Sequence, residues 1–182
     1  ELQTTSTLFQ NHIAPKVGIM GHSMGGGASF LAASNNTNIH ALIGLAPAET
    51  TPSAIAVAPN VLVPSIVFSG SSDGVTPPAQ NHIPMFDGMT STCKSFVSIT
   101  GGGHCYFANA NFNCDFGEST SSTGISITRA QQQAATFAVL DPWLDYMLKD
   151  ICLAYSSFQL AIANSPGIVG QTTCPSIPTV DI

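Results

Sequence analysis

The chain has 182 residues, which is enough for one ordinary domain with a sizeable core. Only 8% of the residues are charged, and four Lys and Arg face ten Asp and Glu, so no basic patch is available to hold nucleic acid or an anionic membrane. No apolar run approaches the roughly 20 residues that a membrane-spanning helix needs, so we expect no membrane span.

The first predicted elements are a short helix and a strand–turn–helix unit. Apolar residues recur at loose helical spacing through residues 1–12, and Pro15 ends any helix there. The apolar run of residues 17–20 then ends in Gly21. Small residues follow in the stretch GGGASFLAAS, which is typical of a helix that packs closely on its neighbours.

Apolar runs bounded by turn residues continue along the chain, each about as long as a buried parallel strand. These runs are His40–Leu45, Ser65–Ser69 and Ser95–Ile99. Helical patterns cover Ile83–Met89 and the longer segment Arg129–Leu148, in which Asp141-Pro142 predicts a bend. Strands that alternate with helices predict a parallel α/β sheet.

After Asp150 the pattern dissolves into a tail rich in Ser, Pro and Thr. Cys152 and Cys174 lie there, where disulfides from them would hold this irregular segment, as a staple, against the rest of the domain. The five Cys lack C-x-x-C spacing, which predicts disulfides in an oxidising compartment and no metal site. An odd count leaves a free thiol or a partner outside this chain. The Cys are Cys93, Cys105, Cys114, Cys152 and Cys174.

Residues 21–25 read Gly-His-Ser-Met-Gly, a G-x-S-x-G nucleophile elbow with an apolar strand before it and a glycine-rich helix after it. Such a strained turn lifts the serine hydroxyl out of the sheet, and its glycines prevent clashes between strand and helix. We therefore predict Ser23 as the nucleophile and the Met24 backbone N–H as an oxyanion donor. The alternative is a Gly/Ser-rich turn without chemistry.

A nucleophilic serine needs a base and an acid that orients the base, and here the expected order is Ser, acid, His. Asp73 follows the run Ser65–Ser69 in the turn-rich stretch SSDGVTPP, although Asp-Gly is also a frequent turn pair. His104 follows Ser95–Ile99 and a glycine run whose flexibility would let the ring swing over the nucleophile. Asp73 is the predicted acid and His104 the predicted base.

Other residues of the right type rank lower. Glu49 and Asp115 are spare acids near the predicted site loops, but solvated surface carboxylates are the default interpretation. Surface or structural roles suit the remaining histidines better, because they precede strands, open a helix or occupy the elbow. These are His12, His22, His40 and His82.

The stretches GHSMGGG, SSDGVTPP and GGGH resemble cutinase-type polyester hydrolases and related dienelactone-hydrolase-like lipases of the α/β-hydrolase fold. The resemblance covers roughly residues 16–150 and carries over Ser23, Asp73, His104 and the Met24 amide. It implies a mainly parallel sheet flanked by helices. We expect residues 1–150 to form the catalytic portion and residues 151–182 a tail packed on the same domain, stapled by a disulfide.

Two departures from the family pattern bear on the substrate. Family polyesterases often carry a Trp on the loop after the strand that follows the elbow, where this chain has Ala48. The segment CYFANANFNCDFGESTSSTG, residues 105–124, is longer than its equivalent and rich in aromatic residues, which either line a pocket or anchor the loop. Cys105 and Cys114 bracket much of it and favour pairing. The candidate substrate-binding residues are His22, Ala48, Tyr106 and Phe107.

Enzymes of this fold place several strands and a second oxyanion loop before the elbow, whereas about twenty residues precede Ser23 here. Without those strands one sheet edge would expose apolar surface and unpaired backbone groups. The N-terminus also lacks a signal-peptide pattern. We expect a fragment whose partner is the missing N-terminal part. The residue that supplies the second oxyanion donor is therefore not identified by this sequence.

The resulting hypothesis is a secreted serine hydrolase, extracellular or periplasmic, of the lipase, esterase or cutinase type. It would cleave carboxylic esters of lipids or polyesters through a Ser-His-Asp triad and an acyl-enzyme. No metal, cofactor or nucleic-acid partner is implied. The alternatives are a non-catalytic binding module, an acyltransferase or a peptidase on the same fold.

Overall fold

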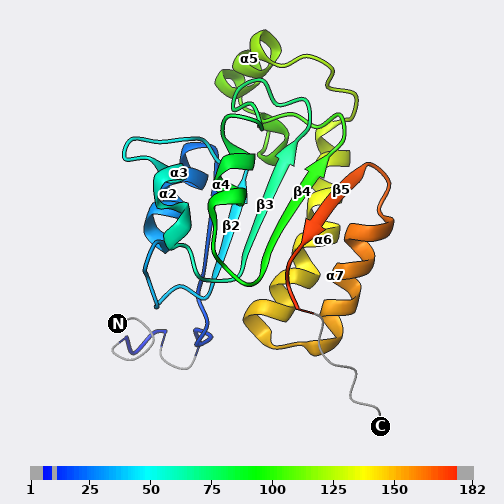
Figure 1. Cartoon of the computed structure of the whole chain (residues 1–182). Coiled ribbons are helices and arrows are strands. Elements are labelled where there is room, and N and C mark those ends of the chain that lie inside the picture. The colour runs from blue at the N-terminus through cyan, green and yellow to red at the C-terminus, as the bar shows by residue number, and fades with distance from the viewer. Residues whose placement is uncertain (1–5, 10–11, 176–182) are drawn as a thin grey trace.

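A five-stranded sheet forms the centre of the computed structural model, which describes residues 6–9 and 12–175 (Figure 1). The strands lie side by side in chain order, and the first four are parallel while the last runs antiparallel to its neighbour. They are β1 (Gly18–His22), β2 (Ala41–Leu45), β3 (Ser65–Gly70), β4 (Lys94–Ile99) and β5 (Ile168–Thr172). The predicted strands and the mainly parallel sheet flanked by helices are confirmed.

Helices cover both faces of the sheet (Figure 1). On one face lie α2 (Met24–Ala33), α3 (Ala54–Val57), the 3₁₀ turn η1 (Ala58–Asn60) and α4 (His82–Gly88). On the other lie α6 (Arg129–Lys149) and α7 (Cys152–Asn164). Beyond the carboxyl ends of the strands lie the 3₁₀ turn η2 (Cys105–Phe107) and α5 (Phe112–Ser121).

The core is split by the sheet into two apolar layers because alternate strand residues face opposite sides. Leu42 and Val67 pack with Phe30 of α2 and Met85 of α4. The neighbouring strand residues pack with α6 and α7 on the other side, in a cluster that includes Ile43, Ile66, Phe68, Trp143 and Phe158. A sheet covered on both faces explains why the strands read as continuous apolar runs.

The C-terminal part corrects one expectation. The chain after Asp150 is not irregular: α7 packs against α6, and β5 pairs with β4 in antiparallel register. The long predicted helix is one element, α6, which continues through Pro142. Of the predicted opening helix, residues 7–9 form a turn, and residues 1–5 and 10–11 lie outside the described residues.

Two disulfides cross-link this fold. Cys93 bonds Cys174, which joins the start of β4 to the chain after β5. Cys105 bonds Cys114, as predicted from their positions around the loop after His104. Cys152 is exposed and forms no disulfide in the described part of the chain, so its expected role as a staple is wrong.

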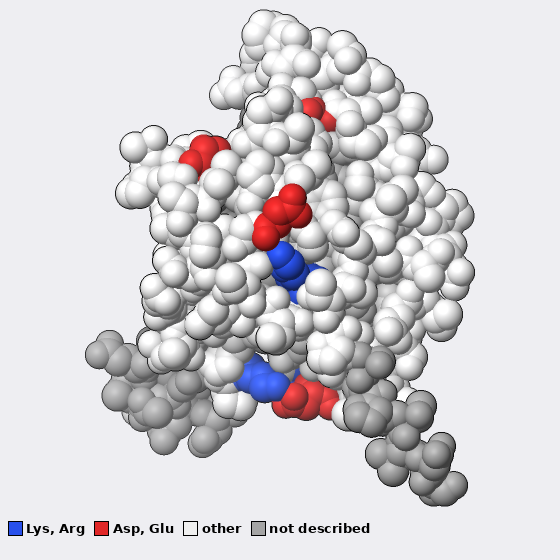
Figure 2. Space-filling model, in the orientation of Figure 1, with Lys and Arg blue, Asp and Glu red and all other residues white. Residues whose placement is uncertain are grey.

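Charged side chains are few and scattered on the face shown in Figure 2. Lys94 illustrates how a rare charge is used, because its Nζ donates to the carbonyl oxygens of Phe86, Asp87 and Met89 at the end of α4. Among the described residues no helix combines the length and the apolar character needed to cross a membrane.

Candidate active site

The predicted nucleophile lies in a strained turn between β1 and α2. Ser23 has φ 57° and ψ −124°, in the region of positive φ that only glycine adopts readily. Gly21 is required here because a Cβ on it would collide with the Gly25 carbonyl, and a Cβ on Gly26 would meet Pro47. The sequence pattern thus gives the sharp elbow that it predicts.

Backbone hydrogen bonds with β2, with the loop that follows it and with α2 hold this turn. The Ser23 N–H donates to Leu45 O at 3.0 Å, and Ser23 O accepts from the N–H groups of Ala48 at 2.9 Å and Gly27 at 3.1 Å. The Ser23 side chain makes no cap bond to α2, so it does not occupy the first N–H groups of that helix, which include Met24. The hydroxyl and these donors therefore lie at the same end of α2.

The predicted acid is buried in the loop after β3. Its Oδ1 accepts backbone N–H groups from Val75 at 2.9 Å and Thr76 at 2.7 Å. Its Oδ2 accepts the Thr76 hydroxyl at 3.0 Å and His104 Nδ1 at 2.8 Å. Asp73 is 4% exposed, so these four donors replace water around the carboxylate and fix its orientation.

The predicted base follows β4 on a glycine run that is tightly held. Gln132 of α6 accepts the Gly103 N–H at 2.9 Å and donates to Gly103 O at 2.8 Å. The Cys105 N–H donates to the buried Glu118 of α5, and the disulfide from Cys105 to Cys114 joins the same two elements. The swinging motion expected from the glycines is not supported, because these contacts hold the chain on both sides of His104.

His22 connects the elbow to the base. Its Nε2 lies 3.0 Å from His104 O, and the two rings have centroids 4.6 Å apart. Burial and the neighbouring His104 lower the pKa of His22. Within the described residues no hydrogen bond joins the Ser23 hydroxyl to His104. In free enzymes such contacts are often long and shorten when substrate binds.

Two side chains that sequence reasoning did not place at the site belong to it. Thr76 Oγ1 lies 2.7 Å from His104 Nδ1 and 3.0 Å from His82 Nε2, besides its contact with Asp73. His82 Nδ1 in turn lies 2.8 Å from Ser69 Oγ. A surface or structural role was predicted for His82 because it opens a helix, and nothing local in the sequence marks it as buried.

The four substrate-binding candidates occupy different positions. Ala48 is buried, and its N–H supports the elbow. The Tyr106 ring lies under the Arg129 guanidinium, 4.8 Å from its centroid, which anchors it to α6. The Phe107 ring lies 6.4 Å from that of His22, beside the elbow. A direct role of these side chains in binding substrate remains a prediction.

The two spare acids do not contact the base. Glu49 Oε2 accepts the Ile55 N–H at 2.9 Å, at the start of α3. Asp115 pairs with Arg129. Among the acids of the described part of the chain, the ion pairs place only Asp73 beside the His104 ring.

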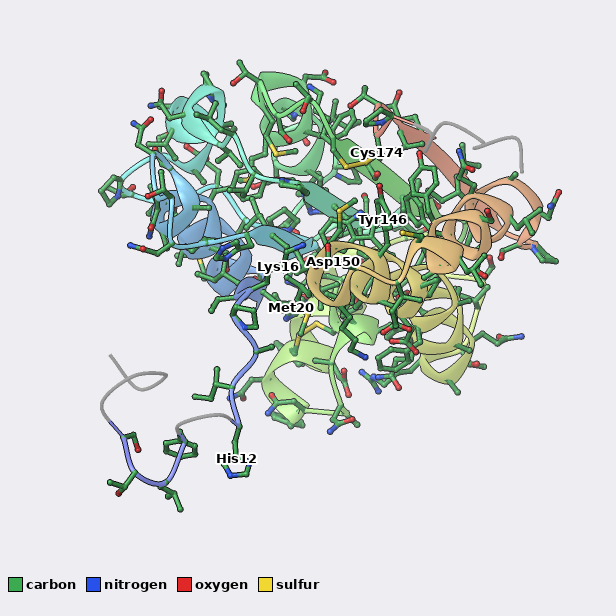
Figure 3. The ribbon with its side chains drawn as sticks, turned by 90° about the horizontal axis from the view of Figure 1, so that it is seen from below. His12, Lys16, Met20, Tyr146, Asp150 and Cys174 are labelled. Atoms are coloured by element: carbon green, nitrogen blue, oxygen red, sulfur yellow. A yellow bond between two sulfur atoms is a disulfide. The ribbon has the colours of Figure 1, made fainter. Side chains whose placement is uncertain are left out.

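A pocket of about 640 Å³ lies at the amino ends of the strands, at the opposite end of the sheet from Ser23, Asp73 and His104. Figure 3 shows Lys16 and Asp150 pointing toward one another there, and the two form an ion pair. Lys16 Nζ also donates to Met147 O. The cation in this pocket is already paired, so we do not assign the chemistry to it.

Comparison with known proteins identifies relatives of this chain. The family described as PETase, PET hydrolase-like, matches residues 2–127. A bis(hydroxyethyl) terephthalate hydrolase from Streptomyces coelicolor is 31% identical over 90 residues, covering 49% of this chain and 28% of the relative. Cutinase est1 from Thermobifida alba is 28% identical over 105 residues, covering 57% and 34%, and a cutinase from Thermobifida fusca is 26% identical over 103 residues, covering 56% and 33%.

The chain spans about a third of the length of the curated relatives it matches. The family match includes the elbow, the acid loop, the base loop and α5, and ends just before α6. Because this match covers more than half of the 182 residues, the chain belongs to the PET hydrolase-like family of α/β-hydrolases.

Proposed function

We propose that this chain carries the catalytic residues of a serine hydrolase that cleaves carboxylic esters. One observation carries the proposal: a buried His104–Asp73 pair lies beside a strained elbow that presents Ser23. A scaffold protein has no need of a fixed imidazole–carboxylate pair next to an elbow of this kind. The matched relatives, whose names are those of ester hydrolases, support the same reaction.

The proposed reaction uses each residue in one role. His104 Nε2 takes the proton of the Ser23 hydroxyl, and Oγ attacks the ester carbonyl. Asp73 accepts a hydrogen bond from the Nδ1–H of His104 and stabilises the imidazolium that forms. The Met24 N–H donates to the developing oxyanion. His104 then protonates the leaving alcohol, and a water that it activates hydrolyses the acyl-enzyme, which regenerates Ser23.

Polyesters and lipid esters are the proposed substrates. The names of the relatives, a bis(hydroxyethyl) terephthalate hydrolase and two cutinases, favour esters of aromatic or aliphatic acids. The exposed Met24 and the half-buried Phe107 give the surroundings of the elbow an apolar character that suits such acyl groups. An extracellular place of action is supported by the two disulfides.

The free edge of β1 is the proposed place for further pairing. Among the strands that the structure describes, β1 hydrogen-bonds only to β2, and Met20 within it is 57% exposed. An edge with unpaired backbone groups accepts another strand readily. We propose that a further strand pairs here and brings the second oxyanion donor.

The test is labelling with a fluorophosphonate, which reacts rapidly only with a serine activated by a base. Mass spectrometry of peptides should locate the adduct on Ser23 in the parent chain. Ser23→Ala and His104→Gln should abolish it, while Ser119→Ala and His12→Gln, which change exposed residues of the same types, should not. Turnover of bis(2-hydroxyethyl) terephthalate and of p-nitrophenyl butyrate then compares the two ester classes.

Absence of an adduct in a chain that circular dichroism shows to be folded, repeated with the longest natural form of the protein, would contradict the proposal. Such a result favours a binding module that keeps the fold. Labelling without ester turnover would instead favour acyl transfer or peptide cleavage on the same residues.

A further inference from the structure

A chain of buried hydrogen bonds continues beyond Asp73 through Thr76, whose hydroxyl shares Asp73 Oδ2 with His104. It runs from Asp73 Oδ2 through Thr76 Oγ1 and His82 Nε2 to His82 Nδ1 and Ser69 Oγ, with steps of 3.0, 3.0 and 2.8 Å between residues. His82 is fully buried, and Ser69 and Thr76 are 1% and 7% exposed. Water therefore cannot easily replace any of these partners.

The position of the protons in this chain follows from the carboxylate. Thr76 has one hydroxyl proton, and its oxygen lies within hydrogen-bond distance of Asp73 Oδ2 and of nitrogens on His82 and His104. Ionised Asp73 can only accept, and its Oδ2 lies at 3.0 Å, nearer than the other oxygen acceptor, Ala46 O at 3.5 Å, so the Thr76 proton points at Oδ2. The Thr76 oxygen then accepts from His82, which requires that His82 carry its proton on Nε2 and accept the Ser69 hydroxyl at Nδ1.

The other tautomer of His82 is unfavourable at this site. If Nε2 accepted the Thr76 proton, two oxygens 3.0 Å apart would face one another without a hydrogen between them, and one belongs to a carboxylate. In a buried site such an unpaired contact costs more than it would in water. The charge on Asp73 and the tautomer of His82 therefore depend on each other.

Neutrality of His82 completes the arrangement. Burial lowers the pKa of His82 to about 4, against the opposing effect of Asp73, and His104 and His22 are the other titratable groups that act on it. His82 Nε2 lies 3.7 Å from Asp73 Oδ2. A protonated His82 would compete with His104 for that oxygen, whereas the neutral ring supplies orientation without charge.

We propose that His82 is a positioning residue for the triad: as the neutral Nε2–H tautomer it holds the Thr76 hydroxyl as a donor to Asp73 Oδ2. This proposal rests on the proposed function of Asp73 and His104. The fixed Thr76 donor prevents the carboxylate from rotating when His104 becomes imidazolium. His82 never touches the substrate and acts only through Thr76.

A double-mutant cycle tests this coupling. Thr76→Val removes the hydroxyl at nearly constant volume, and His82→Phe removes both ring nitrogens. Each change should lower kcat about tenfold with little effect on KM, since each removes one oriented hydrogen bond from the carboxylate. If His82 acts through Thr76, the double variant should be no slower than the slower single variant. His82→Gln, whose amide can still donate to Thr76, should stay within about threefold of the parent.

The pH profile distinguishes positioning from a purely structural role. Loss of the Thr76 donor should shift the pKa that governs the acidic limb of kcat, whereas a loss of packing alone should lower Tm and leave that pKa unchanged. His12→Phe is the matched control, because His12 is exposed and lies outside the site. The proposal would be overturned if the kcat losses of the two single variants multiplied in the double variant, or if His82→Phe kept full activity.

A second readout does not need turnover. Long-range ¹H–¹⁵N spectra of the histidine rings should show His82 neutral with its proton on Nε2 between pH 6 and 8, and this preference should weaken in Thr76→Val. A proton on Nδ1, or no response to Thr76→Val, would overturn the proposal even if the chain were inactive. Lack of ester turnover with the expected tautomer would instead count against the proposed function alone.

Discussion

The acid–base side of the candidate site and the nucleophile elbow are built in different ways. Asp73 and His104 follow β3 and β4 in the middle of the sheet and are 4% and 2% exposed. Ser23 follows β1 at the sheet edge, between Met20 and Met24, whose side chains are 57% and 61% exposed. The difference shows that the buried pair depends on hydrogen bonds made to its side chains, whereas the elbow depends on backbone geometry.

This contrast has a physical reason. A buried carboxylate needs several donors to replace water, and the loop after β3 provides them from the adjacent residues Val75 and Thr76. The elbow carries no buried charge, so glycines and three backbone hydrogen bonds on one side are enough to hold φ of Ser23 at 57°. Substitutions at the buried pair should therefore act by removing hydrogen bonds, whereas substitutions at the elbow should act by distorting the backbone.

The largest effect should come from Asp73→Asn. An amide donates where the carboxylate accepted, so His104 would adopt the wrong tautomer and the Thr76 proton would lose its acceptor. We expect kcat to fall by about 10⁴-fold with KM nearly unchanged. Steady-state kinetics on a soluble ester checks this. Asp115→Asn, at a carboxylate paired with Arg129 on α6, is the control and should keep most of the activity.

Gly21→Ala tests the elbow by geometry alone. The new methyl group would collide with the Gly25 carbonyl, so β1 and α2 must move apart. Displacing the nucleophile by about 1 Å should slow fluorophosphonate labelling by about 100-fold. Gly25→Ala is the matched control, because a Cβ there meets nothing within 4 Å. Equal labelling rates in the two variants would show that the turn tolerates more movement than we infer.

The two disulfides should separate stability from activity. Cys93 and Cys174 are 81 residues apart, so replacing both by Ala should lower the free energy of unfolding by about 4.5 kcal/mol through loop entropy. The Cys105–Cys114 bond closes 9 residues, and its loss should cost about 2.6 kcal/mol. Only the second adjoins His104, so only its removal should slow labelling, by about tenfold if one anchoring contact is lost. Denaturant unfolding and labelling rates check both statements.

The sequence predicted the triad because each member is marked locally. Ser23, Asp73 and His104 each follow an apolar strand within a few residues, and turn residues bound the loops. His82 and Thr76 could not be found in this way, since their roles arise when the loop after β3 and α4 fold over Ser69. A histidine that opens a helix looks the same in sequence whether it is buried or exposed.

The C-terminal part shows a second limit of sequence patterns. α7 was missed because polar residues interrupt its apolar spacing, and Leu153 and Leu160 are 84% and 61% exposed, which blurs the buried stripe. The partner of Cys174 could not be deduced, because five Cys allow many pairings and this one closes an 81-residue loop. The pairing of Cys105 with Cys114 was accessible because both flank one segment.

The last expected effect is a loss of stability at mildly acidic pH. The pKa of His82 is lowered from 6.5 to about 4 in the folded chain, so below pH 6.5 the unfolded chain binds a proton that the native chain does not. Its contribution to stability is complete above pH 6.5 and is lost as pH falls toward 4, by up to about 3 kcal/mol. His82→Gln cannot titrate, so its free energy of unfolding should fall less than that of the parent between pH 7 and 4.5. Parallel pH dependence of the two proteins in urea titrations would mean that His82 is accessible to protons in the native state, which would contradict its closed, buried position between Ser69 and Thr76.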